Sequence, residues 1–179
     1  MLTEIEPNTL YELYVKTDCG LGFTSAWVGP VTAYTGLTHT MQKTGTETVT
    51  TCNMMIYDDG GATGDYSSSC NSTLVIMPET QGAFVHITGF SDNEGGSYTV
   101  YDYLDIYDGV GTSGTKLARY AGHNDQIVDV LSESGPLAIY FKSDGSGNYS
   151  GFELLAECVI INCQAPKNVT VSDITATSA

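Results

Sequence analysis

Short runs in which apolar and polar residues alternate recur along this chain, and Gly, Asn, Pro or Asp-Gly interrupt them after a few positions. Clear examples are the runs 72–77, 83–90, 103–107 and 137–142. A two-residue period is that of a β-strand, whose successive side chains point to opposite faces, and helical periodicity is almost absent. The chain is therefore predicted to be all-β, with many short antiparallel strands that form a sandwich or barrel.

Composition narrows the classes of function. With 41% apolar and 10% aromatic residues, the 179-residue chain has enough apolar side chains for a packed core. Its net charge of −15 repels nucleic acid and anionic lipid, so we expect no nucleic-acid partner. No run approaches the roughly 20 apolar residues of a membrane span, so no membrane insertion is expected. Few lysines, many glycines and five spread-out cysteines are typical of a secreted, extracellular β protein with disulfides.

Sequence motifs for catalysis do not occur. The chain has no Gly-x-Ser-x-Gly, no His-Glu-x-x-His and no glycine-rich phosphate loop. His39, His86 and His123 lie far from the cysteines in sequence, and no Cys-x-x-Cys pair is present, which argues against zinc. We therefore expect no catalytic residues and no enzymatic activity.

Both ends of the chain resemble parts of a fibronectin type III domain. Residues 1–36 contain "IEPNTLYELYV", which is similar to the last third of such a domain, and Tyr11 would be its tyrosine corner. Residues 163–179, "CQAPKNVTVSDITATSA", resemble its first strand. Neither piece is a whole domain, so the chain is predicted to be a window from a longer array, in which the partner of Cys19 lies outside the window.

The middle of the chain, residues 46–159, resembles a CUB domain, with residues 37–45 as a linker before it. Four features occur in the family's order: two cysteines around a glycine-rich turn with a Tyr, then "STLVIMP", "YDYLDIYDG" and "FKSDGSGNYSGF". The resemblance implies a jelly-roll β-sandwich of a secreted protein. Ser72 replaces the family's usual Trp and the second family disulfide is absent, which suggests a divergent, bacterial-like branch.

Asp102 stands out within the "YDYLDIYDG" strand. Alternation places it on the same side as Leu104 and Ile106, at the edge of the core, while Tyr103 and Asp105 face outward. A carboxylate in that position costs several kcal/mol unless it is paired, and the sequence offers no nearby Lys or Arg. A bound cation would offset that cost.

The CUB resemblance implies a calcium site. Glu94, Asp102 and Asp144 match the acidic positions of calcium-binding members, and the backbone around Ser146 would add carbonyl oxygens. Tyr66 matches a tyrosine that hydrogen-bonds this cluster. Carboxylate and carbonyl oxygens are the ligands that Ca²⁺ prefers. The alternative is that these residues are solvated acids in turns.

Cysteine pairing is also implied by the resemblance. Cys52 and Cys70 match the family's first disulfide, and Cys158 and Cys163 are close enough in sequence to bridge. A rival scheme pairs Cys163 with a downstream cysteine and leaves Cys158 free.

These features predict a non-catalytic, calcium-stabilised binding and spacer module of a long secreted or cell-surface protein, such as an adhesin or a filament that self-assembles. The resemblance implies protein ligands that present a basic side chain to the acidic cluster. Outward Tyr101, Tyr103 and Tyr107 could instead stack on glycans, or simply pack across strands. The alternative function is an accessory region of a secreted protease or glycosidase.

Overall fold

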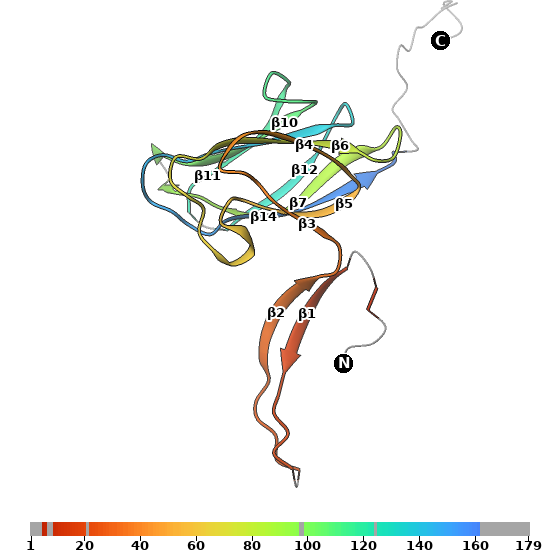
Figure 1. Cartoon of the computed structure of the whole chain (residues 1–179), viewed down its shortest axis with the longest axis vertical. Helices are drawn as coiled ribbons and strands as arrows, with labels where there is room; N and C mark the ends of the chain where they lie inside the picture. Colours follow the sequence, from red (N-terminus) through yellow and green to blue (C-terminus); the bar gives the residue numbers. More distant parts are fainter. Residues whose placement is uncertain (1–4, 7–8, 21, 97–98, 124, 162–179) are drawn as a thin grey trace, which may run out of the picture.

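The computed structural model describes residues 5–6, 9–20, 22–96, 99–123 and 125–161. Two five-stranded sheets pack face to face (Figure 1). One sheet has the order β11 (Lys116–Ala121), β10 (Tyr103–Asp108), β13 (Leu137–Lys142), β6 (Asn71–Pro78), β4 (Thr44–Thr51). The other has the order β12 (Gln126–Leu131), β7 (Phe84–Asp92), β14 (Gly151–Val159), β5 (Asn53–Tyr57), β3 (Leu37–Thr40).

The predicted all-β sandwich is confirmed. Neighbouring strands run antiparallel except at one edge of each sheet, where β4 pairs with β6 and β3 with β5 in parallel. Within the described residues, one 3-10 turn, η1 (Gly61–Thr63), and the short strands β8 (Gly95–Gly96) and β9 (Thr99–Val100) lie in the connections. The described part of the chain contains no helix long and apolar enough to cross a membrane.

The core lies between the two sheets. Alternate residues of each central strand point inward, as the two-residue period predicts. The fully buried side chains include Ile56, Leu74, Leu104, Ile139 and Leu154. Both sheets therefore contribute to one continuous apolar cluster, which packs the sandwich together.

Residues 37–45 do not form the expected linker. Leu37–Thr40 is strand β3 and pairs with β5, and β4 begins at Thr44. Met41, between these strands, is buried in the core, and its N–H donates to the carbonyl of Tyr57 at 2.9 Å. The sandwich therefore begins at Leu37, because this stretch supplies the outer strand of one sheet and leads directly into the other.

The N-terminal residues form a hairpin, β1 (Leu10–Val15) and β2 (Val28–Tyr34), which extends away from the sandwich (Figure 1). One of its contacts with the sandwich is with Asn53, whose side chain accepts a hydrogen bond from the hydroxyl of Tyr34. A hairpin alone does not identify a fibronectin type III domain, so that assignment stays a prediction. The matching C-terminal stretch, residues 163–179, lies outside the described residues.

The predicted Cys52–Cys70 disulfide is wrong. Cys52 bonds to Cys158, with a Cα–Cα distance of 4.6 Å. Strands β5 and β14 are neighbours, so Cys158 lies beside Cys52, whereas Cys70 precedes β6 in the opposite sheet. This bond also excludes the Cys158–Cys163 bridge and a free Cys158, and Cys163 itself lies outside the described residues.

Cys70 is a free, buried thiol. Its Sγ lies 2.9 Å from the carbonyl oxygen of Ser67 and 3.2 Å from Oδ1 of Asp59. Burial, reinforced by the hydrogen bond with Asp59, raises the pKa of the Cys70 thiol to about 12. A thiol with so high a pKa is a structural side chain that is unreactive at neutral pH.

Candidate metal centre

Three acidic residues meet at one end of the sandwich because strands β7, β10 and β13 each begin or end there. Asp102 directly precedes β10, and Asp144 lies two residues after β13. These strands are neighbours, with Tyr103 opposite Lys142, so the two acids are at the same edge of the sheet. Glu94 lies two residues after β7, which belongs to the other sheet. The two sheets thus contribute jointly to the cluster.

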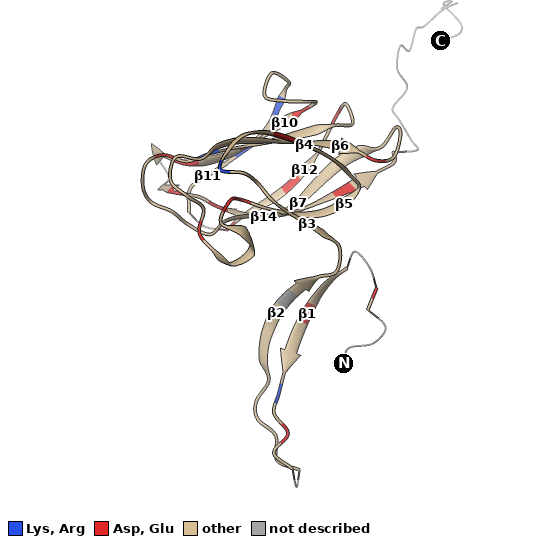
Figure 2. Ribbon diagram, in the orientation of Figure 1, with Lys and Arg blue, Asp and Glu red and all other residues tan. Residues whose placement is uncertain are grey.

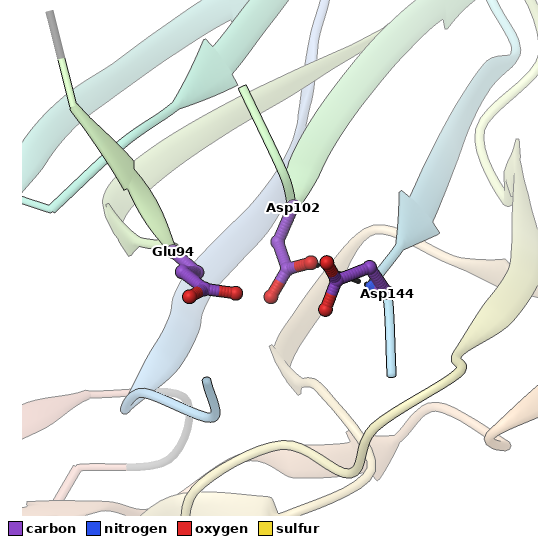
Figure 3. Close-up of side chains that lie close together, drawn as sticks. All are labelled: Glu94, Asp102 and Asp144. Atoms are coloured by element: carbon purple, nitrogen blue, oxygen red, sulfur yellow. Dashed lines mark hydrogen bonds between the residues drawn. The ribbon is translucent and has the colours of Figure 1, made fainter. Parts of the chain in front are cut away.

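The three side chains point toward a common centre (Figure 3). One carboxylate oxygen from each of Glu94, Asp102 and Asp144 lies within 4.8 Å of the other two. Asp102 is buried, Glu94 is half-buried and Asp144 is exposed. The arrangement can hold a metal ion that is reached from solvent on the Asp144 side.

Hydrogen bonds position Asp102 within the cluster. The Tyr66 hydroxyl donates to its Oδ2 at 2.6 Å, and the Asp144 N–H donates to its Oδ1 at 2.7 Å. The same hydroxyl accepts a 2.9 Å hydrogen bond from the Glu94 N–H. Tyr66 is itself 1% exposed. Tyr66 therefore contacts the acidic cluster and links Asp102 to the backbone of Glu94, and its role beside a bound ion stays a prediction.

Glu94 lies directly against the backbone of Gly147. A Cβ at position 147 would come within 2.1 Å of the Glu94 carboxyl carbon, so only glycine leaves room for this carboxylate. Gly147 also has φ +78°, which favours glycine. Ser146, predicted to provide a carbonyl ligand, donates its N–H to Oδ1 of Asp144 at 2.9 Å, and its role as a ligand stays a prediction.

Electrostatics at this end disfavour three bare carboxylates. Burial raises the pKa of Asp102 above its usual value, against the hydrogen bonds from Tyr66 and Asp144. Partial burial and the negative charges of Asp144 and Asp102 raise the pKa of Glu94. Oε2 of Glu94 is buried without a hydrogen-bond partner among the described residues. A cation at the centre would relieve each of these costs.

Asp105 is another buried acid, and its burial was not anticipated. Asp105 is 1% exposed, although it lies on the outer face of its sheet as predicted. Arg119 holds it with two hydrogen bonds of 2.6 and 2.7 Å, and Lys116 adds an ion pair of 2.7 Å. The cations also lie over tyrosine rings, Arg119 over Tyr103 at 4.0 Å and Lys116 over Tyr107 at 5.4 Å.

The sequence feature that could have revealed the ion pair between Asp105 and Arg119 is the β10–β11 hairpin. Asp105 lies directly opposite Arg119 in the antiparallel register, a position that strand counting across the hairpin could have found. Burial opposes ionisation of Asp105, but the hydrogen bonds from Arg119 and Lys116 outweigh it, so its pKa lies below the usual value. This acid is fully paired and is not a metal ligand.

The protein is thus an all-β sandwich in which acids from both sheets meet at one end. A profile of the CUB domain family matches residues 46–155, which is more than half of the chain, and the chain therefore belongs to the CUB domain family. CUB domains are generally non-catalytic binding modules, and they occur in secreted or extracellular proteins.

Curated relatives match over short stretches. Bone morphogenetic protein 1 of Xenopus laevis is 38% identical over 68 residues, which cover 38% of this chain and 10% of the relative. The Cubilin homolog of Drosophila melanogaster is 34% identical over 105 residues, which cover 55% of this chain and 3% of the relative. The chain thus spans a tenth or less of the length of these two relatives.

Solved structures support the fold. The MASP-1 CUB2 domain bound to Ca²⁺ aligns with a TM-score of 0.53 at 21% identity, covering 64% of this chain and 98% of that one. At this level of identity the similarity concerns the fold, and the calcium belongs to that protein.

Proposed function

We propose that this chain is a calcium-stabilised, non-catalytic binding module of an extracellular protein. The observation that carries the proposal is the convergence of Glu94, Asp102 and Asp144 from both sheets. Calcium takes six to eight oxygen ligands, and this donor set consists only of oxygens. Ser146 and Gly147 are the backbone positions that would add carbonyl ligands, with water completing the shell. The bound ion would tie the loops at this end together.

The alternative that these acids are merely solvated fits the site less well. Asp102 is 0% exposed, so water does not solvate its carboxylate. The buried Oε2 of Glu94 lacks a partner among the described residues. A solvated turn acid would have neither property, whereas a carboxylate that awaits a cation has both.

The partner is proposed to be a protein that presents a basic side chain to this cluster. Three carboxylates and one calcium ion leave a net charge of −1, which attracts a cation. Asp and Glu positions (red) outnumber Lys and Arg positions (blue) over the sandwich (Figure 2), in agreement with the net charge of −15. A glycan partner is less favoured, because cations of the chain already lie over Tyr103 and Tyr107, although Tyr101 is 50% exposed.

We further propose that the module belongs to a longer repeat protein with fibronectin type III neighbours, such as a cell-surface adhesin or filament. The hairpin supports this, because its side chains Phe23, Trp27, Val28 and Val31 are 61–73% exposed. Two strands alone bury too little apolar surface to be stable, so a further layer would cover them. A catalytic motif in adjoining sequence would instead support the accessory region of a hydrolase.

A thermal melt with and without calcium tests the proposed function. Extracellular calcium modules have a Kd of about 0.1–1 mM, so about 10 mM calcium stabilises the folded state by about 1.4–2.7 kcal/mol. At about 2–4 °C per kcal/mol, the melting temperature should rise by about 3–11 °C over the value in chelator. Asp144→Asn should lose that rise, and Glu79→Gln, an exposed acid outside the cluster, should retain it. Equal melts of the unaltered chain in calcium and chelator would contradict the proposal.

A further inference from the structure

The outer face of the sheet that contains β7 and β14 has two adjoining hollows. The first has a volume of about 390 Å³ and is lined by Tyr57, Phe90, Asp125 and Glu153 among others. The second, of about 350 Å³, shares Phe90 and Glu153 with the first. Each volume is at the lower end of the range for ligand pockets, about 300–1,000 Å³. None of the three cluster acids lines either hollow.

The strand register explains why these side chains meet. Glu153 on β14 lies opposite Tyr57 on one side and Phe90 on the other, and Ile127 continues the same row on β12. Side chains directly opposite on a sheet point to the same face. A carboxylate thus lies between two aromatic rings, of which Phe90 is 57% exposed.

The first hollow carries uncompensated negative charge. Within the described residues, no Lys, Arg or His forms an ion pair with Asp125 or Glu153. Asp92, also in the lining, is engaged, since His123 lies 2.6 Å and the Ser150 hydroxyl 3.1 Å from its oxygens. A cation is therefore the complementary ligand, and aromatic walls suit the methylene stem of a basic side chain.

The second hollow is mostly apolar. Met55 and Leu155 are opposite one another in the next row of the sheet, and Leu10 of the hairpin borders them. Ile127, at the other border, is 73% exposed. An apolar side chain in this hollow would cover surface that otherwise faces water.

We propose that the two hollows together bind a segment of a partner protein that presents Lys or Arg next to an apolar side chain. The basic group lies between Tyr57 and Phe90 with its charge at Glu153 and Asp125. The apolar neighbour lies against Leu155 and Ile127. This inference rests on the proposed binding role of the module, but it requires neither calcium nor the acidic cluster.

Two matched peptides test this site on the whole chain. The probe is acetyl-Gly-Lys-Leu-Gly-amide, and the control peptide has norleucine, an uncharged side chain with a similar stem, in place of Lys. Binding is followed through amide chemical shifts in two-dimensional NMR spectra. We expect shifts at Phe90 and Glu153 and a Kd for the Lys peptide about fivefold lower than for the norleucine peptide.

Variants then assign the binding energy. Glu153→Gln should weaken the Lys peptide about fivefold and leave the norleucine peptide unchanged, whereas Phe90→Ala should weaken both. Glu79→Gln removes an acid that lines neither hollow and should have no effect. Asp144→Asn, tested in chelator, should also have no effect, so failure of the calcium proposal would leave this one standing.

Four results would overturn the inference. The first two are equal affinity for the two peptides and the absence of chemical-shift changes at up to about 20 mM peptide. The third is that Asp144→Asn, and not Glu153→Gln, loses binding of the Lys peptide. The fourth is that a neutral oligosaccharide such as cellotetraose shifts the signals at these hollows and the Lys peptide does not.

Discussion

Replacing Cys158 with serine opens the disulfide to Cys52, which closes a loop with a sequence separation of 106 residues. In the chain-entropy account, a cross-link stabilises by restricting the unfolded chain, and more so for longer loops. The observed pairing is worth about 4.7 kcal/mol on that account, against about 3 kcal/mol for the shorter loop of a Cys52–Cys70 bond. Since domains have only about 5–15 kcal/mol of stability, the Cys158→Ser variant should be close to unfolding at 37 °C.

Urea unfolding followed by far-UV circular dichroism measures this loss. Fluorescence is a poor probe, because Trp27 is the only tryptophan and precedes β2 of the hairpin, outside the sandwich. Cys52→Ser should match Cys158→Ser. The control is Cys70→Ser, which replaces the buried thiol with a hydroxyl. This change should lower the free energy of unfolding by only about 1 kcal/mol. If Cys70→Ser were as damaging as Cys158→Ser, or if peptide mapping joined Cys52 to Cys70, the pairing would be refuted.

Three further outcomes are expected. Gly147→Ala should abolish the calcium-induced rise in melting temperature, because the new methyl displaces the Glu94 carboxylate. The sandwich should still fold, because the positive φ at position 147 adds only about 1–2 kcal/mol of backbone strain. Asp105→Asn should lower the free energy of unfolding, measured in urea at pH 7, by about 1–3 kcal/mol. This loss is smaller than the loss on breaking a fully buried ion pair, because Arg119 is part-exposed. The pKa of Asp105 is lowered in the folded state, so the stabilisation by its ionised carboxylate is fully present above the unfolded pKa of about 3.9. This stabilisation is lost as pH falls through the folded pKa, and urea unfolding at a series of acid pH values measures the loss. Asp58 should have the opposite effect on stability, because burial raises its pKa to about 6 in the folded state. As pH rises from about 4 to 6, the free energy of unfolding should therefore fall by up to about 1.4 kcal/mol per pH unit. Carbon-13 NMR of the Asp58 carboxyl should show the raised titration midpoint.

Local patterns in the sequence determined the strands and the acidic site. The alternation at 72–77 and 103–107 matches β6 and β10, because the two-residue period depends only on neighbouring positions. Glu94, Asp102 and Asp144 were found because they match the acidic positions that the CUB resemblance implies. Each acid lies within two residues of the start or end of a strand, so the motifs that carry the resemblance also gave the positions of the acids.

Pairings between distant residues were decided only by the tertiary structure. Cys52 bonds to Cys158 because β5 and β14 are neighbours, a relation that spacing along the chain does not contain. Asp105 is buried because the β10–β11 register places Arg119 opposite it. In the same way, the hollow around Glu153 exists because three strands meet in one row. The physical reason is common to all three: alternation defines which face a side chain occupies, whereas sheet order and register define what lies beside it.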